Sequence, residues 1–183
     1  MIEINNLTVK LGEKAVFSDY SATLPDEGIV LISGVSGIGK TTLLRVLCGL
    51  QKPDSGRIAG LNDRKISFVF QEPRLLDHLS AFENISIVSD SAKAKELLCR
   101  LNMENELNVK AGKLSGGQKQ RVSLARAFAY SDDVVLLDEP FTGLDGQNKE
   151  KAAQLIRTAR LAVVVSHDPS DAELLDIKEK IQL

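Results

Sequence analysis

Tryptophan is absent from this chain of 183 residues, and aromatic residues make up only 4% of it. The sequence also lacks any apolar run near the ~20 residues that a helix needs to cross a bilayer. If the protein acts at a membrane, we expect another chain to supply the membrane-spanning part. Residues 1–6 contain neither a basic region nor a long apolar stretch, so we expect no secretory signal there.

An excess of charge of either sign is missing as well. Lys and Arg total 23 against 25 Asp and Glu, and the formal net charge is −2. The basic residues are scattered, which is not the footprint of a nucleic-acid binder. Two cysteines, Cys48 and Cys99, suit a reducing compartment rather than a disulfide framework. The length and the 43% of hydrophobic residues are enough for one globular domain with a sizeable core.

What the sequence does contain is a glycine-rich loop, Gly34–Thr41, with the pattern Gly, four residues, Gly-Lys-Thr. The apolar run Ile29–Ile32 before it predicts a buried strand, and residues 41–48 after it predict a helix. In this context the glycines let backbone N–H groups converge on a polyphosphate, and the helix N-terminus adds partial positive charge. The alternative, a glycine-rich turn with a surface lysine, does not require the flanking strand and helix.

This loop predicts a nucleotide-phosphate site with a bound cation. We expect Lys40 to reach the β- and γ-phosphates and the Thr41 hydroxyl to hold Mg²⁺. The residues expected to contact the nucleotide from this loop are Gly34, Ser36, Gly37, Gly39, Lys40, Thr41 and Thr42.

Four apolar runs in the chain are each followed at once by polar residues suited to phosphate or Mg²⁺ chemistry. The residues that follow them are the glycine loop, Gln71, Asp138 with Glu139, and Ser166 with His167. In open parallel α/β sheets, ligands bind beyond the carboxyl ends of the strands. We therefore expect these residues to meet in a single site.

The neighbouring carboxylates Asp138 and Glu139 can divide the labour in such a site. Asp138 is placed to anchor Mg²⁺, and Glu139 is a candidate general base for an attacking water. Without the glycine loop upstream, the pair would equally suit surface acids at a strand end before Pro140. Gln71 can offer its amide oxygen to Mg²⁺ or orient water, and His167 can donate to a γ-phosphate. Taken alone, each of these two is more typical of a surface or structural residue.

The remaining pattern predicts an antiparallel layer, a helical insert and further α/β elements. Residues 91–101 have helical periodicity, with Ser91 as the expected cap. The other expected strands are 2–11, 16–24, 57–59, 66–70, 134–137 and 162–165, and the other expected helices are 116–130 and 147–159.

The segment Leu114–Ala129, which begins Leu-Ser-Gly-Gly-Gln, resembles the signature of the ABC (ATP-binding cassette) ATPases and the helix after it. The other motifs of that family match in order. They are the Walker A loop at 34–41, the Q-loop glutamine at 71, Walker B at 134–139, a D-loop at 143–145 and a switch histidine at 167. The resemblance covers nearly the whole chain.

The resemblance implies an α/β fold. It would be a P-loop NTPase (RecA-like) core with a mainly parallel sheet, an antiparallel β layer at the N-terminus and a short inserted helical subdomain. Residues 1–183 would form a single ABC ATPase domain. Residues 1–71 and 114–183 would be the core with its antiparallel layer, and 72–113 the helical subdomain.

The resemblance also implies the ligands, ATP and Mg²⁺, and a dimer. In the family, two cassettes pack head to tail, and each ATP lies between one Walker A loop and the partner's signature. A signature at a helix N-terminus is physically a second anion site, which a single bound ATP would leave unused. By motif, Thr41, Gln71 and Asp138 would hold Mg²⁺, and Glu139, His167 and Gln71 would be catalytic. Contacts to the partner's nucleotide would come from Ser115, Gly116, Gly117 and Gln118, and Asp145 would link the two sites.

One departure from the family concerns the adenine. An aromatic residue early in the chain usually stacks on the base, whereas the matching place here is Leu11. Phe17 is a less favoured substitute and is expected in the core. We expect base stacking to be weak and affinity to rest mostly on the phosphates. The insert after Gln71 is also shorter than usual.

The resemblance favours an ATPase subunit that powers a membrane transporter, lying in the cytoplasm on the inner face of the membrane and bound to an integral membrane permease. Phe70–Leu76 and Glu83–Ile85 are similar to cassettes of nitrate/sulfonate/taurine importers. One alternative is a soluble ABC ATPase acting on nucleic acid or ribosomes, but no basic extension or second cassette is present. A nucleotide-gated scaffold is a third reading, which the presence of both Glu139 and His167 disfavours.

Overall fold

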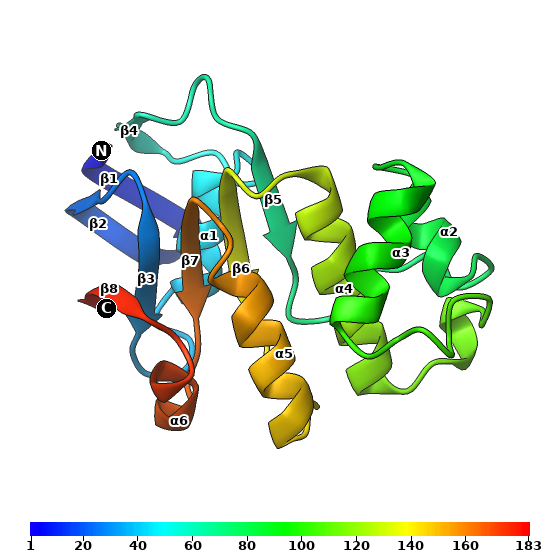
Figure 1. Ribbon diagram of the computed structural model, residues 1–183. Helices are drawn as coiled ribbons and strands as arrows, with labels where there is room; N and C mark the ends of the chain where they lie inside the picture. Colours follow the sequence, from blue (N-terminus) through cyan, green and yellow to red (C-terminus); the bar gives the residue numbers. More distant parts are fainter.

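The computed structural model describes residues 1–183 and contains two sheets (Figure 1). A five-stranded parallel sheet has the order β5-β6-β7-β3-β8, and a three-stranded antiparallel sheet has the order β2-β1-β4. The strands are β1 (Ile2–Leu11), β2 (Lys14–Leu24), β3 (Gly28–Ser33), β4 (Ser55–Ala59), β5 (Ile66–Val69), β6 (Val134–Asp138), β7 (Leu161–Val165) and β8 (Ile177–Gln182).

Six α-helices and one short 3₁₀ turn surround the sheets. They are α1 (Lys40–Leu47), α2 (Ala81–Ser86), α3 (Ser91–Arg100), η1 (Ala111–Lys113), α4 (Gly116–Tyr130), α5 (Gly146–Ile156) and α6 (Pro169–Glu173). None of these helices is long and apolar enough to cross a membrane.

Both faces of the parallel sheet are buried, which explains why its central strands β6 and β7 are apolar at consecutive positions, Val134–Leu137 and Leu161–Val165, rather than at alternate ones. Successive residues of a strand point to opposite faces. Val135 and Leu137 therefore join a core with helices α2 to α5, whereas Val134 and Leu136 join a second core. That second core lies between the parallel sheet, α1 and the antiparallel sheet. The predicted α/β class, with its mainly parallel sheet and its N-terminal antiparallel layer, is confirmed.

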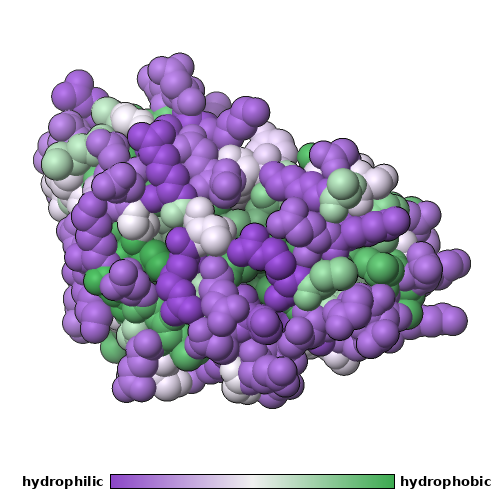
Figure 2. Space-filling view, viewed as in Figure 1, coloured by the Kyte–Doolittle hydropathy of each residue, from purple (hydrophilic) through white to green (hydrophobic).

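Helices α2 and α3 form a helical layer at one side of the molecule together with α4, against which both pack (Figure 1). The expected division at residues 72 and 113 stays a prediction, because α4 contacts this layer and the sheet alike. Apolar side chains are left exposed there: Leu76 is 44%, Ile87 57% and Val88 36% exposed. Figure 2 shows apolar surface over this part of the molecule.

Four elements lay outside the sequence-based assignment: α2, η1, α6 and β8. Helix α2 has only six residues, too few for a periodic pattern, although Ser80 and Glu83 form the reciprocal capping box that marks a helix start. Strand β8 is short of apolar residues because it is an edge strand that pairs only with β3. The expected cap of α3 was wrong, since Asp90 and not Ser91 accepts the backbone N–H groups of Ala92 and Lys93 at 2.9 Å.

Two substitutions distinguish Asp90 from Ser91 as the cap of α3. Asp90→Ala should lower the melting temperature by about 2–4 °C, because two N–H groups of the first turn of α3 lose their acceptor. Ser91→Ala removes a hydroxyl from the helix itself and should leave the melting temperature within about 1 °C. Thermal unfolding followed by circular dichroism measures both, and a larger effect from Ser91→Ala would restore Ser91 as the cap.

Candidate active site

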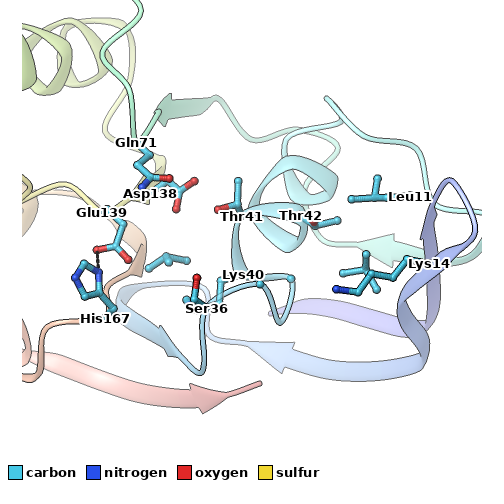
Figure 3. A pocket seen from close by; sticks show the side chains of 14 residues that line it. Leu11, Lys14, Ser36, Lys40, Thr41, Thr42, Gln71, Asp138, Glu139 and His167 are labelled. Carbon is cyan, nitrogen blue, oxygen red and sulfur yellow. Dashed lines mark ion pairs between the residues drawn. The ribbon is translucent and has the colours of Figure 1, made fainter.

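A cavity of about 540 Å³ lies at the carboxyl ends of β3, β5, β6 and β7 (Figure 3). The glycine loop, Gln71, Asp138 with Glu139, and His167 all line it, as expected from the four apolar runs. The full set of lining residues is Leu11, Lys14, Val16, Ser36, Gly37, Gly39, Lys40, Thr41, Thr42, Gln71, Asp138, Glu139, Val165 and His167.

The glycine loop is shaped by backbone conformations that side chains rarely adopt. Gly34, Gly37 and Gly39 have φ of 148°, 77° and 119°. A Cβ on Gly39 would lie 2.5 Å from the Val16 side chain, so only glycine fits where the loop passes the β1–β2 hairpin. Gly34 lies at the base of the loop rather than on the cavity wall.

Lys40 is buried, and its ammonium folds back over the loop that precedes it. Its Nζ donates to the carbonyl oxygens of Gly34 at 2.7 Å and Val35 at 3.0 Å. An ammonium has three donors, so one remains for an anion in the cavity. The loop is therefore closed by the same side chain that brings positive charge to the cavity.

Asp138 ends β6, is only 3% exposed and faces Thr41 at the start of α1 (Figure 3). Burial raises the pKa of its carboxyl, while a hydrogen bond with the Thr41 side chain opposes that rise and the neighbouring Glu139 adds to it. A carboxyl made less stable as an anion by burial gains from a cation placed beside it.

Oxygen donors for a cation come from three elements around this point: the Thr41 hydroxyl, the Gln71 amide and the Asp138 carboxylate. No group of three or more His, Cys, Asp or Glu residues that could hold a metal ion exists in the chain. This donor set fits Mg²⁺, which prefers oxygen ligands and is usually bound by one or two carboxylates together with substrate phosphates.

Glu139 and His167 form an ion pair at one end of the cavity, with His167 Nδ1 2.9 Å from Glu139 Oε2 (Figure 3). Glu139 has a φ of 53°, in the left-handed region that only glycine adopts freely. Its N–H donates to the Val165 carbonyl oxygen at 2.9 Å, which helps to hold that strained turn. A strained residue at a cavity wall is typical of a functional site.

The hydrogen bond to Glu139, followed by the charge of Glu139, raises the pKa of His167 above its ordinary value of 6.5. A raised folded-state pKa contributes stability that is fully present below the ordinary value and is lost as pH rises through the raised one. The His167 side chain is 75% exposed, so solvent screening keeps this contribution small. The pair therefore has more effect on the protonation of His167 in the site than on the stability of the fold.

The far end of the cavity is lined by Leu11, Lys14 and Val16 of the β1–β2 hairpin (Figure 3). Leu11 and Lys14 face each other across the hairpin turn, and Leu11 is 49% exposed. Phe17 is buried in the core beside Tyr20, as expected, and no aromatic residue lines the cavity. Lys14 and Val16 belong to no sequence motif that would predict their place in the site, because only the hairpin register brings them to the glycine loop.

The signature residues and Asp145 do not line this cavity, although the N-terminus of α4 lies at the same end of the molecule (Figure 1). Ser115 and Gln118 cap α4 reciprocally, with hydrogen bonds of 3.3 and 2.9 Å. A Cβ on Gly117 would lie 2.5 Å from the Gly143 carbonyl oxygen, so the signature and the D-loop are in close contact. Asp145 caps α5 by accepting the Asn148 N–H at 2.9 Å. The chain thus has two phosphate-suited ends that do not meet within it.

Comparison with known proteins points to one family. Residues 17–142 match the family model described as "ABC transporter". The chain is 34% identical over 207 residues to the sulfate/thiosulfate import ATP-binding protein CysA of Burkholderia mallei, covering 98% of this chain and 58% of that protein. It is 35% identical over 198 residues to CysA of Escherichia coli strain K12, covering 93% and 54%. The chain spans about half the length of these curated relatives.

Solved structures give the same result for the fold. A dimeric ATP-binding cassette, MJ0796, in a post-hydrolysis state with ADP and Pi superposes with a TM-score of 0.86 at 30% identity, covering 100% of this chain and 94% of that one. An ATP-binding subunit of another ABC transporter superposes with a TM-score of 0.87 at 22% identity, covering 100% and 85%.

The aromatic-free end of the cavity yields a prediction. Leu11→Tyr should tighten ATP binding by roughly fivefold or more, because a ring facing a base adds stacking worth about 1–3 kcal/mol. Inorganic tripolyphosphate, which has no base, is the matched control and should bind both proteins equally. Isothermal titration calorimetry measures both, and unchanged ATP affinity in the variant would show that Leu11 does not face the base.

Proposed function

Because the chain belongs to the ABC transporter family, we propose that it binds ATP with Mg²⁺ and hydrolyses the ATP to power a membrane transporter. The observation that carries this proposal is the convergence of four strand ends on one cavity. They deliver the glycine loop, Gln71, Asp138 with Glu139, and His167 to the same place.

In the proposed reaction, the glycine loop and the free donor of Lys40 hold the β- and γ-phosphates. Thr41, Gln71 and Asp138 would hold Mg²⁺, which neutralises charge on the phosphate oxygens. Glu139 accepts a proton from the attacking water as general base. His167, paired with Glu139 at 2.9 Å, keeps that carboxylate oriented and offers a donor to the γ-phosphate.

Hydrolysis on this scheme requires two chains. The signature at Ser115–Gln118 lies outside the chain's own cavity, so we propose that it contacts a nucleotide held by a second cassette. The match to MJ0796, a dimeric cassette, at 30% identity supports this arrangement. Asp145, at the start of α5 and beside the signature, would then lie near both nucleotides.

The transport partner is proposed to be an integral membrane permease, with the cassette on the cytoplasmic face of the membrane. The exposed apolar residues Leu76, Ile87 and Val88 offer a surface for such a partner. The relatives named for sulfate and thiosulfate import support import as the direction. The nitrate/sulfonate/taurine group, suggested by Phe70–Leu76, is a narrower hypothesis of the same kind.

The proposed general base is tested by Glu139→Gln. The variant should bind ATP with near-normal affinity, accumulate as a closed dimer and lose turnover by about 10² or more, because the amide cannot take a proton from water. Steady-state phosphate release and gel filtration with ATP measure these effects. Hydrolysis at the normal rate in the variant would remove Glu139 from the role of base.

The partner is tested by gentle detergent extraction of native membranes that contain the tagged chain. We expect a polytopic membrane protein in stoichiometric amount. Ile87→Glu, which places a charge on the exposed apolar surface, should reduce this recovery without changing ATP binding. Recovery only from the soluble fraction, with nucleic acid or ribosomes attached, would favour the alternative, a soluble ABC ATPase.

A further inference from the structure

The first turn of α5 makes contacts in two directions that the proposed reaction does not use. Asp145 caps this turn, and the next helical residues with polar contacts are Asn148 and Lys149. Lys149 reaches toward the loop that carries His167, and Asn148 reaches toward the signature helix α4.

Lys149 binds two carboxylates that follow β7. Its Nζ lies 2.7 Å from Asp171 Oδ1 and 3.2 Å from Asp168 Oδ2. The Asp171 side chain is 5% exposed and that of Lys149 is 23% exposed. Removing one partner from an ion pair that is shielded from solvent in this way strongly destabilises the folded protein, because the other charge stays buried without a partner.

The same carboxylates hold both neighbours of His167. Ser166 Oγ donates to Asp171 Oδ2 at 2.8 Å and accepts the Asp168 N–H at 3.1 Å. Asp168 is fixed further by the Ser170 N–H and hydroxyl, and these bonds, with that from Lys149, lower its pKa to about 2. The exposed His167 side chain has Glu139 as its one polar partner. Its position therefore depends on the backbone on either side of it.

Asn148 makes the contact to the signature side. Its Oδ1 accepts from Arg121 Nη1 of α4 at 3.2 Å and from Asn102 Nδ2 at 3.4 Å, and its Nδ2 donates to Asp145 Oδ2 at 2.9 Å. Arg121 is 9% exposed and also donates to the carbonyl oxygens of Leu101 and Asn102, each at 2.8 Å. A buried guanidinium with several partners holds α4 in one place relative to α5.

We propose that Lys149 is a positioning residue for His167 and that Asn148, beside it, ties the same helical turn to the signature helix. The first turn of α5 then joins the site in which a chain binds its own nucleotide to the surface that it presents to a second cassette. The part of this inference that concerns turnover and assembly rests on the proposed function, whereas the placement of His167 does not.

Nuclear magnetic resonance titration tests the placement without nucleotide. The chain has only two histidines, so the signal of His78 serves as an internal reference. The charged groups that face His167 are Glu139, Asp168 and Asp171, with Lys149 compensating the last two. Lys149→Met should move the His167 midpoint to lower pH, because a displaced imidazole loses the Glu139 hydrogen bond that raises its pKa, and Asp171→Asn should also move it to lower pH. A midpoint that is unchanged or moves to higher pH in Lys149→Met would overturn the proposal, because His167 would then have kept its place beside Glu139.

Turnover supplies the second test, with controls from the same helix. Lys149→Met should lower kcat roughly tenfold or more with ATP affinity within about twofold, because His167 is displaced while the glycine loop is intact. Lys149→Arg keeps the charge and should restore most of the rate. Lys151→Met removes a lysine that makes no ion pair and should leave kcat unchanged. Equal losses in Lys149→Met and Lys149→Arg would contradict the role of the charge.

The proposed role of Asn148, which contacts the signature helix α4, is tested by measuring ATP-dependent dimerisation. In the Glu139→Gln background, Asn148→Ala should weaken the ATP-dependent dimer several-fold, while ATP binding to the single chain stays the same. Gln147→Ala, an exposed neighbour, is the matched control and should not alter the dimer. If the Asn148→Ala protein dimerises as strongly as the Gln147→Ala protein, the proposed role of Asn148 is overturned. Failure of the unsubstituted protein to hydrolyse ATP and of the Glu139→Gln variant to dimerise with ATP, with the His167 shifts intact, would instead overturn the proposed function.

Discussion

Parallel pairing in a fixed register is the constraint on which the rest of this structure depends. Leu137 pairs with Val164 and Asp138 with Val165, so the polar residues after β6 and β7 leave the sheet at the same level. Ile32 pairs with Val165 on the other side, which brings the glycine loop to that level too. Because both faces of these strands are buried, a slip by one residue would exchange the side chains of the two cores, so the register is strongly specified.

The strained turn at Glu139 shows how the sheet transmits order to the site. A glutamate at φ 53° before Pro140 is unfavourable on its own, by about 1–3 kcal/mol. It persists because its N–H is bound to β7 and because Phe141, two residues on, is 2% exposed in the larger core. With the backbone in this turn, the carboxylate lies beside His167 at one end of the cavity. Packing of the core therefore sets the direction of the group proposed as the base.

The sequence predicted those parts of the fold that rest on local chemistry. The glycine loop, the helix from Gly116 to Tyr130 and the apolar strands β6 and β7 carry strong local signals, and the structure has them at or within one residue of the expected bounds. It could not show that Lys14 lines the cavity, that β8 pairs with β3, or that Lys149 meets Asp171, since each depends on residues brought together from far apart in the chain. The roles of the site residues stay predictions.

The reciprocal cap at the start of α4 has a consequence for how reversible an assembly of two such chains would be. Ser115 and Gln118 already satisfy each other's backbone N–H groups in the single chain. A phosphate that approaches from a second cassette would find the Gly116 and Gly117 N–H groups without an acceptor, but it would reach those of Ser115 and Gln118 only by displacing the cap. At these two groups, only the difference between the old and the new hydrogen bonds would favour association. Such an exchange suits a contact that forms and dissolves in every cycle, because the cap forms again each time the chains separate.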